Sequence, residues 1–203
     1  MTPLRALFLL ALAVYPASSQ VIDFESGGLH YKTLTKNGLT IMFAHLPTQI
    51  REYTIVQVAI SNGSRIPWMI KPTDFRFEKS GSVVLTPTNP RAVVNELIAK
   101  AGRSDVIKLV ATYEIGLYGL NRMQSTNGYE QRRQAAAAEL VAGKLKAAAA
   151  ASAIAFVDIK LMPGQSTDGA MFFSNQGKPL GEGKLIVKAA GETFEFPSEP
   201  FAP

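Results

Sequence analysis

The amino-acid sequence predicts a mainly β protein, an antiparallel β-sandwich interrupted by about three helices. Two stretches, 53–85 and 156–196, alternate apolar and polar residues with the period of two that half-buried strands show. The residues between them, 91–155, instead follow helical spacing and include an alanine-rich run. We therefore expect two β-halves that share one core across a helical insertion at about 89–155, all within a single domain of residues 20–203.

The first nineteen residues have the pattern of a secretory signal peptide. Arg5 gives a basic start, and residues 7–14 (LFLLALAV) form an apolar core too short to span a bilayer. Pro16 and the small residues before Gln20 complete a cleavage site. The chain has no cysteine, which excludes a lipid anchor, disulfides and cysteine metal sites. We expect a bacterial protein, periplasmic or released, with no transmembrane anchor after cleavage.

The N-terminal part predicts a hairpin and then a central strand. Residues 20–28 are expected to form a loose leader. Asn37-Gly38 tolerates positive φ at both positions, as a tight type I′ turn between residues 29–34 and 39–44 requires. Residues 53–60 carry little charge on either face, which is typical of a strand covered on both sides. Short strands are also expected at 74–78 and 83–85.

Helix signals begin at residue 89. Asn89 followed by Pro90 is a favourable start, and Val94, Leu97, Ile98 and Ala101 are expected to form a buried stripe. Ser104 is placed to cap a second helix. Asn127 and Glu130 resemble a capping box for a third helix over about 129–152.

From residue 156 the period returns to two, and frequent glycines and prolines separate further short strands. Seven to nine short strands with frequent turns indicate a sandwich or barrel. The expected C-terminal strands are 156–161, 170–173, 184–188 and 193–196.

Two segments of the β-halves resemble the telokin-like, immunoglobulin-like domains of uncharacterised bacterial secreted proteins and lipoproteins. The first segment has Val56, Val58 and Ile60 before Asn62, and the second has Leu161 followed by Pro163-Gly164-Gln165. The positions that extend the two motifs are Ser61, Pro67, Ile70, Pro72, Phe75, Gly169, Phe172 and Phe173. The resemblance implies an immunoglobulin-like sandwich and carries no catalytic residue. The chain departs from the family in its helical insertion and in lacking the cysteine at which such lipoproteins are lipidated.

Charge is concentrated in the predicted helices. Residues 91–155 hold nine basic and five acidic residues, while the rest of the chain from Gln20 onward has eleven of each sign. An anionic partner would be drawn to the helical part, although a solvated surface of mixed charge explains the same pattern. Candidate contact residues at the start of the third helix and before it are Arg122, Tyr129, Arg132 and Arg133.

Signals for catalysis or metal binding are weak. The chain has two histidines, His30 and His45, which could meet with Asp23 or Glu25 at a metal, but two separate structural histidines explain them as well. Ser166 lies in a glycine-rich segment whose spacing is not that of a nucleophile elbow, which favours a polar turn. Asn62-Gly63-Ser64 is formally a glycosylation sequon, and a turn is the alternative.

These observations predict a non-catalytic binding or structural protein, with the helical insertion as a protein-contact surface. The alternatives are a module that binds an anionic or carbohydrate envelope polymer through its basic helices, and an unrecognised hydrolase. We expect no cofactor, no bound metal and no nucleic-acid partner, because no phosphate loop, dinucleotide fingerprint or ligand cluster is present in the sequence.

Overall fold

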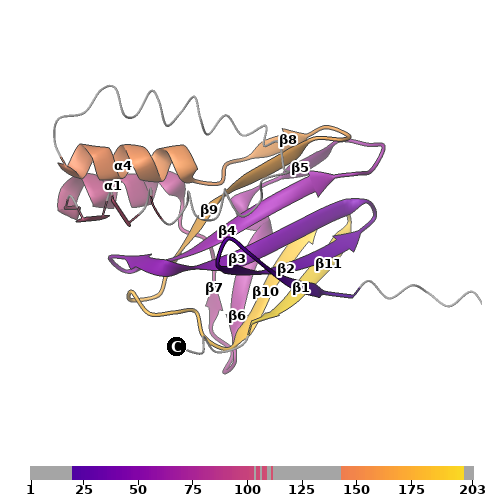
Figure 1. The fold of residues 1–203 in the computed structure, drawn as a ribbon, viewed down its shortest axis with the longest axis horizontal. Helices are drawn as coiled ribbons and strands as arrows, with labels where there is room; N and C mark the ends of the chain where they lie inside the picture. The colour runs from indigo at the N-terminus through magenta and orange to yellow at the C-terminus, as the bar shows by residue number, and fades with distance from the viewer. Residues whose placement is uncertain (1–19, 103, 106, 109–110, 112–142, 199–203) are drawn as a thin grey trace, which may run out of the picture.

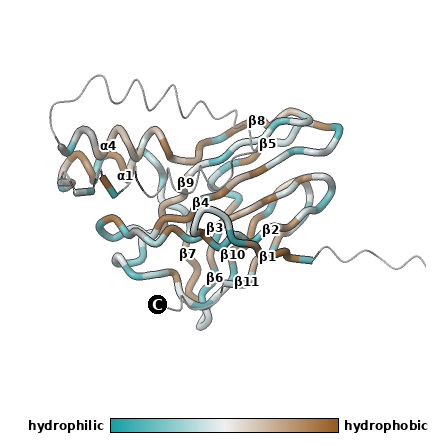
Figure 2. The backbone as a smooth tube through the Cα atoms, viewed as in Figure 1, coloured by the Kyte–Doolittle hydropathy of each residue, from teal (hydrophilic) through white to brown (hydrophobic). Residues whose placement is uncertain are grey.

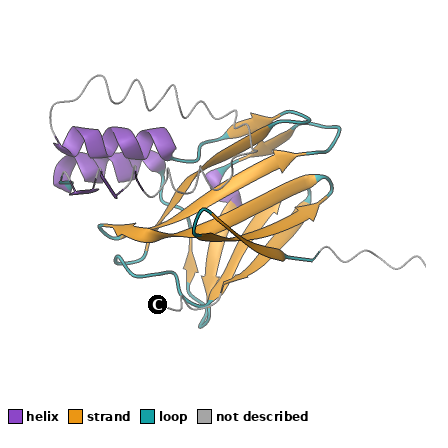
Figure 3. Cartoon of the chain, in the orientation of Figure 1, coloured by secondary structure: helices purple, strands orange, loops and turns teal. Residues whose placement is uncertain are grey.

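The structure, a computed structural model, describes residues 20–102, 104–105, 107–108, 111 and 143–198. The predicted signal peptide lies outside these residues. Within them the chain is mainly β, and every pairing between its named strands is antiparallel (Figure 3). No helix among the described residues is both long and apolar enough to cross a membrane.

The strands form two main sheets and a short ribbon (Figure 1). The five-stranded sheet has the order β1 (Ile22–Ser26), β2 (Leu29–Lys36), β3 (Leu39–Ile50), β4 (Tyr53–Asn62), β9 (Ser166–Ser174). The four-stranded sheet has the order β11 (Glu192–Ser198), β10 (Gly183–Ala189), β6 (Phe75–Lys79), β7 (Val84–Leu85). The ribbon pairs β5 (Trp68–Ile70) with β8 (Ile159–Leu161), and a short 3-10 helix, η1 (Pro72–Asp74), leads from β5 into β6.

The two sheets pack face to face over a core of large side chains. Val56, Val58 and Ile60 of β4 lie in this core with phenylalanines of β6 and β11. Phe156 and Leu161, which follow the helical insertion, belong to the same cluster. The β-halves on either side of the insertion therefore share one core. Figure 2 shows the strands alternating between hydrophobic and hydrophilic colour along their length.

A second core covers the opposite face of the five-stranded sheet. It joins Tyr53 and Ile55 of β4 and Phe172 of β9 to the two described α-helices, α1 (Pro90–Lys100) and α4 (Gly143–Ile154). These helices contact each other and lie against the sheet as a third layer (Figure 1). β4, between β3 and β9, is thus buried on both faces, which confirms its predicted central position.

The prediction of about three helices is corrected, because the structure describes two α-helices. α4 covers the C-terminal half of the predicted third helix and runs two residues beyond it, while most of the predicted second helix and the start of the third lie outside the described residues. The buried stripe of α1 is also rotated from the prediction. Val93 and Leu97 are fully buried, but Ile98 is 42 % exposed.

The expected loose leader is wrong, because residues 22–26 form strand β1, which pairs with β2. Gly27 and Gly28 both adopt positive φ, which allows the tight turn that brings β1 back onto β2. Phe24 stacks on Tyr31 of β2 with ring centroids 5.3 Å apart and 13° between the planes. Ile22 and Phe24 alternate with Asp23 and Glu25, a period-two pattern that the sequence already contains.

Candidate functional site

The contact surface was predicted in the helical insertion, but none of its four candidate residues is among those that the structure describes. Arg122, Tyr129, Arg132 and Arg133 all lie outside the described residues. The described part of the insertion consists of α1, α4 and short pieces of the segment that follows α1. The site therefore consists of the contacts that hold these helices to the sheet and of the side chains that they expose to solvent.

Alanines let the helical layer approach the sheet closely. Six alanines of α4 and the residue after it are buried: Ala147, Ala148, Ala150, Ala151, Ala153 and Ala155. At the end of α4 the chain meets β9, where the Phe156 amide donates to the Ala170 carbonyl at 2.8 Å. Gly169 is required here, because a Cβ on it would lie 2.7 Å from the Phe156 Cα. Small side chains on the helix and the strand thus fix how closely the layers pack.

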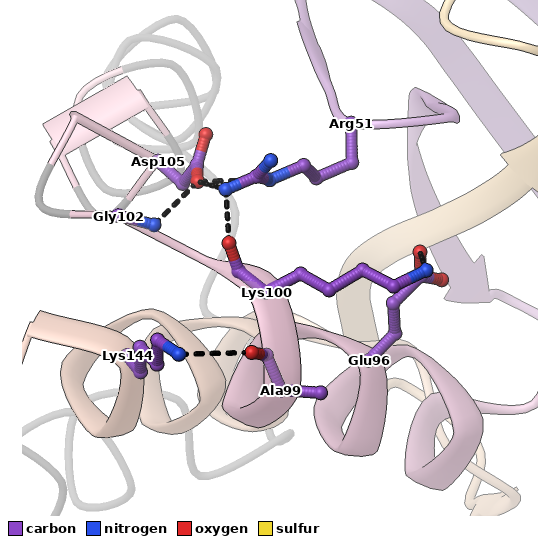
Figure 4. Close-up of polar contacts among 7 residues, drawn as sticks. All are labelled: Arg51, Glu96, Ala99, Lys100, Gly102, Asp105 and Lys144. Carbon is purple, nitrogen blue, oxygen red and sulfur yellow. Dashed lines mark hydrogen bonds and ion pairs between the residues drawn. The ribbon is translucent and has the colours of Figure 1, made fainter.

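Arg51, in the turn between β3 and β4, holds the C-terminal end of α1 (Figure 4). Its guanidinium lies 3.1 Å from the Asp105 carboxylate and also donates to the Lys100 carbonyl. The Asp105 carboxylate accepts a further hydrogen bond from the Gly102 amide at 2.8 Å. The last carbonyls of a helix have no partner within the helix, and a cation at this end is favoured by the helix dipole. Arg51 therefore links the sheet directly to α1.

Lys144 makes the same kind of contact from α4. Its Nζ donates to the Ala99 carbonyl at 2.9 Å, so two adjacent carbonyls at the end of α1 accept hydrogen bonds from cations (Figure 4). Lys100 of α1 pairs with Glu96 at 3.3 Å. Both lysines therefore make contacts within the protein.

Tyr53 and Glu96 make a further link between β4 and α1. The Tyr53 hydroxyl donates to the Glu96 carboxylate at 2.5 Å. This hydrogen bond holds the pKa of Glu96 below its usual value, and burial together with the neighbouring carboxylate raises the pKa of Tyr53. The pair is therefore a phenol and a carboxylate ion at neutral pH, which stabilises the contact between helix and sheet.

The described helical segments expose both aliphatic and basic side chains. Ile98 is 42 % exposed and Ile107 is 61 % exposed. Arg91, Asn95 and Lys108 are exposed on the same segment. Exposed aliphatic side chains on a firmly held helix are typical of a contact surface, although single ones also occur on ordinary surfaces. We call Ile98 and Ile107 the helical apolar pair.

The two histidines occupy different environments. His30 is exposed on β2, opposite Glu25 of β1, while Asp23 pairs with Lys32 at 2.9 Å. His45 is half-buried between the sheets, edge-on to Phe43 and Phe77. Among the described residues, no group of three or more His, Asp or Glu side chains is placed to bind a metal.

His45 has a partner far along the chain, Ser198 of β11. Its Nε2 lies 3.0 Å from the Ser198 hydroxyl, across 153 residues of chain. Burial, with Lys32 nearby, lowers the pKa of His45 to about 4, so the imidazole is neutral at physiological pH. A pocket of about 40 Å³ adjoins the pair, which is room for a water molecule but far below the roughly 300 Å³ of a small-molecule site. We therefore assign the pair a structural role.

The two segments quoted for the family resemblance meet in space. Trp68 pairs with Leu161 in the β5–β8 ribbon, and the Asn62 amide donates to the Gln165 carbonyl at 2.9 Å. The Asn62 side chain is fully buried and donates to the carbonyls of Ile66 and Leu161 at 2.8 and 3.0 Å. Both amide hydrogens of the sequon asparagine are thus used inside the protein, which favours the structural role over glycosylation.

Ser166 lies in a strand, not in a turn as predicted. The turn ends at Gln165, and Ser166 is the first residue of β9, opposite Ser61 of β4. The two hydroxyls are 3.0 Å apart. Cross-strand hydroxyl pairs of this kind stabilise a sheet, which accounts for Ser166 without a catalytic role.

A buried polar group on the helix side of the five-stranded sheet was also missed. The Tyr31 hydroxyl donates to the Gln57 side chain at 3.1 Å, and burial, with Asp168 nearby, raises the pKa of Tyr31 to about 12. Gln57 is fully buried, and its Nε2 has no hydrogen-bond partner among the described residues. The sequence signal was Gln57 itself, the one strongly polar side chain among the apolar residues of the central strand.

A comparison with protein-family models, curated proteins and solved structures finds no match to this chain.

Proposed function

We propose that this protein is an exported, non-catalytic binding or structural protein of the bacterial envelope, which contacts a protein partner through its helical layer. The supporting observation is the combination of firm attachment and exposure. α1 is held to the sheet by Arg51 and by the Tyr53–Glu96 hydrogen bond, while the helical apolar pair, Ile98 and Ile107, faces solvent. A held surface loses less conformational freedom on binding than a mobile one.

The proposal includes an immunoglobulin-like sandwich as the scaffold and export through the N-terminal signal. Two facing antiparallel sheets and the contact between the two quoted segments support the scaffold. The apolar run of residues 7–14 supports export. In this arrangement the β-sheets provide a stable platform and the helical insertion provides the distinctive surface.

Capture of partners from the native envelope fraction tests the protein-contact role. We expect the chain from Gln20 onward to retain a defined partner, and Ile98→Asp with Ile107→Asp to lose it. A matched control is Val83→Asp with Val84→Asp, because these valines are 52 % and 51 % exposed and lie at β7 in the other sheet. Equal losses in both double variants, with each still folded by circular dichroism, would contradict the proposal.

The second candidate is a module for an anionic or carbohydrate envelope polymer. It is supported by the excess of four positive charges over residues 91–155 and by the exposure of Arg91 and Lys108. Retention on an immobilised anionic polymer should then weaken with salt and disappear in Arg132→Ala with Arg133→Ala. Retention that does not depend on salt, or that survives this variant, counts against the polymer and leaves the protein partner.

A further inference from the structure

The β5–β8 ribbon exposes a second apolar surface, separate from the helical layer. Ile66 is 51 % exposed, Met69 is 53 % exposed and Met162 is 44 % exposed. Met69 lies opposite Lys160 in the ribbon, and Met162 follows Lys160 by two residues on the other strand. Met69 lies in β5 itself, and Ile66 and Met162 lie just beyond the two strands at the same end of the ribbon. We call Ile66, Met69 and Met162 the ribbon patch.

The ribbon patch is held by a built framework rather than by a loose loop. The Ile66 carbonyl accepts hydrogen bonds from the Asn62 side chain at 2.8 Å and from the Ser64 hydroxyl at 3.0 Å. The Trp68 indole donates to the same Ser64 hydroxyl at 3.0 Å. The Asn62 side chain also holds the Leu161 carbonyl, which places the Met162 end of the ribbon beside Ile66. The backbone that carries these apolar side chains is therefore held in place.

Cations outnumber carboxylates beside the ribbon patch, and one nearby carboxylate, Asp74, accepts a hydrogen bond from the Lys71 amide at 2.7 Å. Arg65 precedes Ile66, Lys71 is two residues beyond Met69, and Lys160 lies between the two methionines. All three cations are exposed. Asp158 is the only acidic residue in 63–71 and 157–165, so the two segments together carry an excess of two positive charges. The rest of the chain outside the helical part has no such excess, because the β-halves are neutral in total.

We propose that the ribbon patch and its cations bind an anionic lipid surface. Three side chains are a small area compared with the roughly 800 Å² that each partner buries in a specific protein interface. A bilayer interface requires less, because a few inserted apolar side chains act together with cations that attract anionic headgroups. Methionine suits this role, since its flexible side chain adapts to an irregular apolar environment. The proposal does not depend on the helical layer, and the protein could bind lipid and a protein partner at the same time.

Sedimentation with lipid vesicles tests the proposal. The chain from Gln20 onward contains every described element and avoids the apolar segment 7–14. We expect it to bind vesicles that mix phosphatidylglycerol with phosphatidylcholine, to bind them less at high salt, and to leave pure phosphatidylcholine largely unbound. Met69→Ser with Met162→Ser should lower binding about tenfold or more. Arg65→Gln with Lys160→Gln should lower it by a similar factor.

Matched variants control for fold and for general charge. Val83→Ser with Val84→Ser removes two equally exposed apolar side chains elsewhere, and Lys184→Gln with Lys188→Gln removes two exposed cations of β10. Both should bind as the parent chain does. The proposal is overturned if anionic vesicles do not retain the chain or if the control variants lose binding equally. A dimer in solution that Met69→Ser with Met162→Ser converts to monomer would also overturn it, in favour of a second copy of this chain.

Discussion

The two faces of the five-stranded sheet are covered in different ways. The inter-sheet face packs against the other sheet through aromatic and branched side chains, including Phe43, Phe75, Phe77, Phe194 and Phe196. The helix face packs mainly against alanines of α4, together with Val93 and Leu97 of α1 and Ala101 directly after it. A buried phenylalanine removes far more apolar area from water than a buried alanine does.

This difference indicates that the two layers are held by different forces. Burial of large apolar side chains stabilises the contact between the sheets. The helical layer gains less from burial, and its attachment to the sheet therefore depends more on specific polar contacts, from Arg51 and the Tyr53–Glu96 pair. We expect the helical layer to open before the sheets separate, as a region with fewer large buried side chains does.

The largest effect is expected from a large-to-small change in the inter-sheet core. Phe77 is fully buried on β6. Phe77→Ala should lower the free energy of unfolding by about 3–5 kcal/mol, because it removes apolar contacts and leaves a cavity. Denaturant unfolding measures the change. Val84→Ala on the neighbouring strand, where the side chain is 51 % exposed, should stay within about 0.5 kcal/mol. Similar losses in the two variants would show that the inter-sheet core is not the main source of stability.

A second effect in the same core depends on pH. His45 has its pKa lowered to about 4 in the folded protein, whereas the unfolded chain binds the proton near 6.5. Between these values the unfolded state holds more protons, so stability is complete above about pH 6.5 and falls as the pH drops towards 4. The expected loss in the free energy of unfolding is about 3 kcal/mol, because each tenfold difference in proton affinity between the folded and unfolded states corresponds to about 1.4 kcal/mol.

Unfolding of His45→Gln at pH 7 and pH 4.5 checks this contribution. The variant should lose less stability on acidification than the parent chain, because carboxylates titrate equally in both proteins. His30→Gln is the matched control, since it removes an exposed imidazole from β2 and leaves the inter-sheet core intact. An unchanged pH dependence in His45→Gln would mean that burial of the imidazole does not control acid stability.

At the junction of the helical layer with the sheet, an added methyl group should be costly. A Cβ at Gly169 would lie 2.7 Å from the Phe156 Cα, so Gly169→Ala forces the end of α4 away from β9. We expect a loss of about 1–3 kcal/mol in denaturant unfolding. Gly102→Ala is the control, because its Cβ would meet the nearest atoms at an ordinary 3.9 Å. If Gly169→Ala lowered the free energy of unfolding no more than Gly102→Ala does, the close packing of the end of α4 on β9 would not contribute to stability.

Local signals in the sequence predicted local structure well. Asn37 and Gly38 adopt φ of 48° and 74°, as the predicted hairpin turn requires. The Asn89 side chain accepts a hydrogen bond from the Arg91 amide at the start of α1. Both predictions rest on neighbouring residues whose conformational preferences are intrinsic to the chain.

Features that depend on distant residues were missed or misplaced. The contact of His45 with Ser198 and the burial of the Asn62 side chain arise only when segments far apart in the sequence meet. The exposure of Ile98 follows from the position of α4 beside α1, which the helical period alone does not specify. Strand β1 was missed although its residues alternate and two glycines form its turn, because a period-two run of five residues is a weak signal.

The smallest expected effect distinguishes attachment of the helical layer from overall stability. The Arg51 side chain is 38 % exposed, so solvent screens its ion pair with Asp105. Arg51→Gln keeps a side chain at a backbone φ of 56° but removes the charge. We expect a loss of less than about 1 kcal/mol in global unfolding. Amide hydrogen exchange should nevertheless become faster at the C-terminal end of α1, while β4 stays protected. Arg76→Gln removes a comparable ion pair with Glu78 in β6 and should leave exchange in α1 unchanged. If exchange in α1 did not respond to Arg51→Gln, the Tyr53–Glu96 hydrogen bond and the apolar packing would hold α1 on the sheet without a contribution from Arg51.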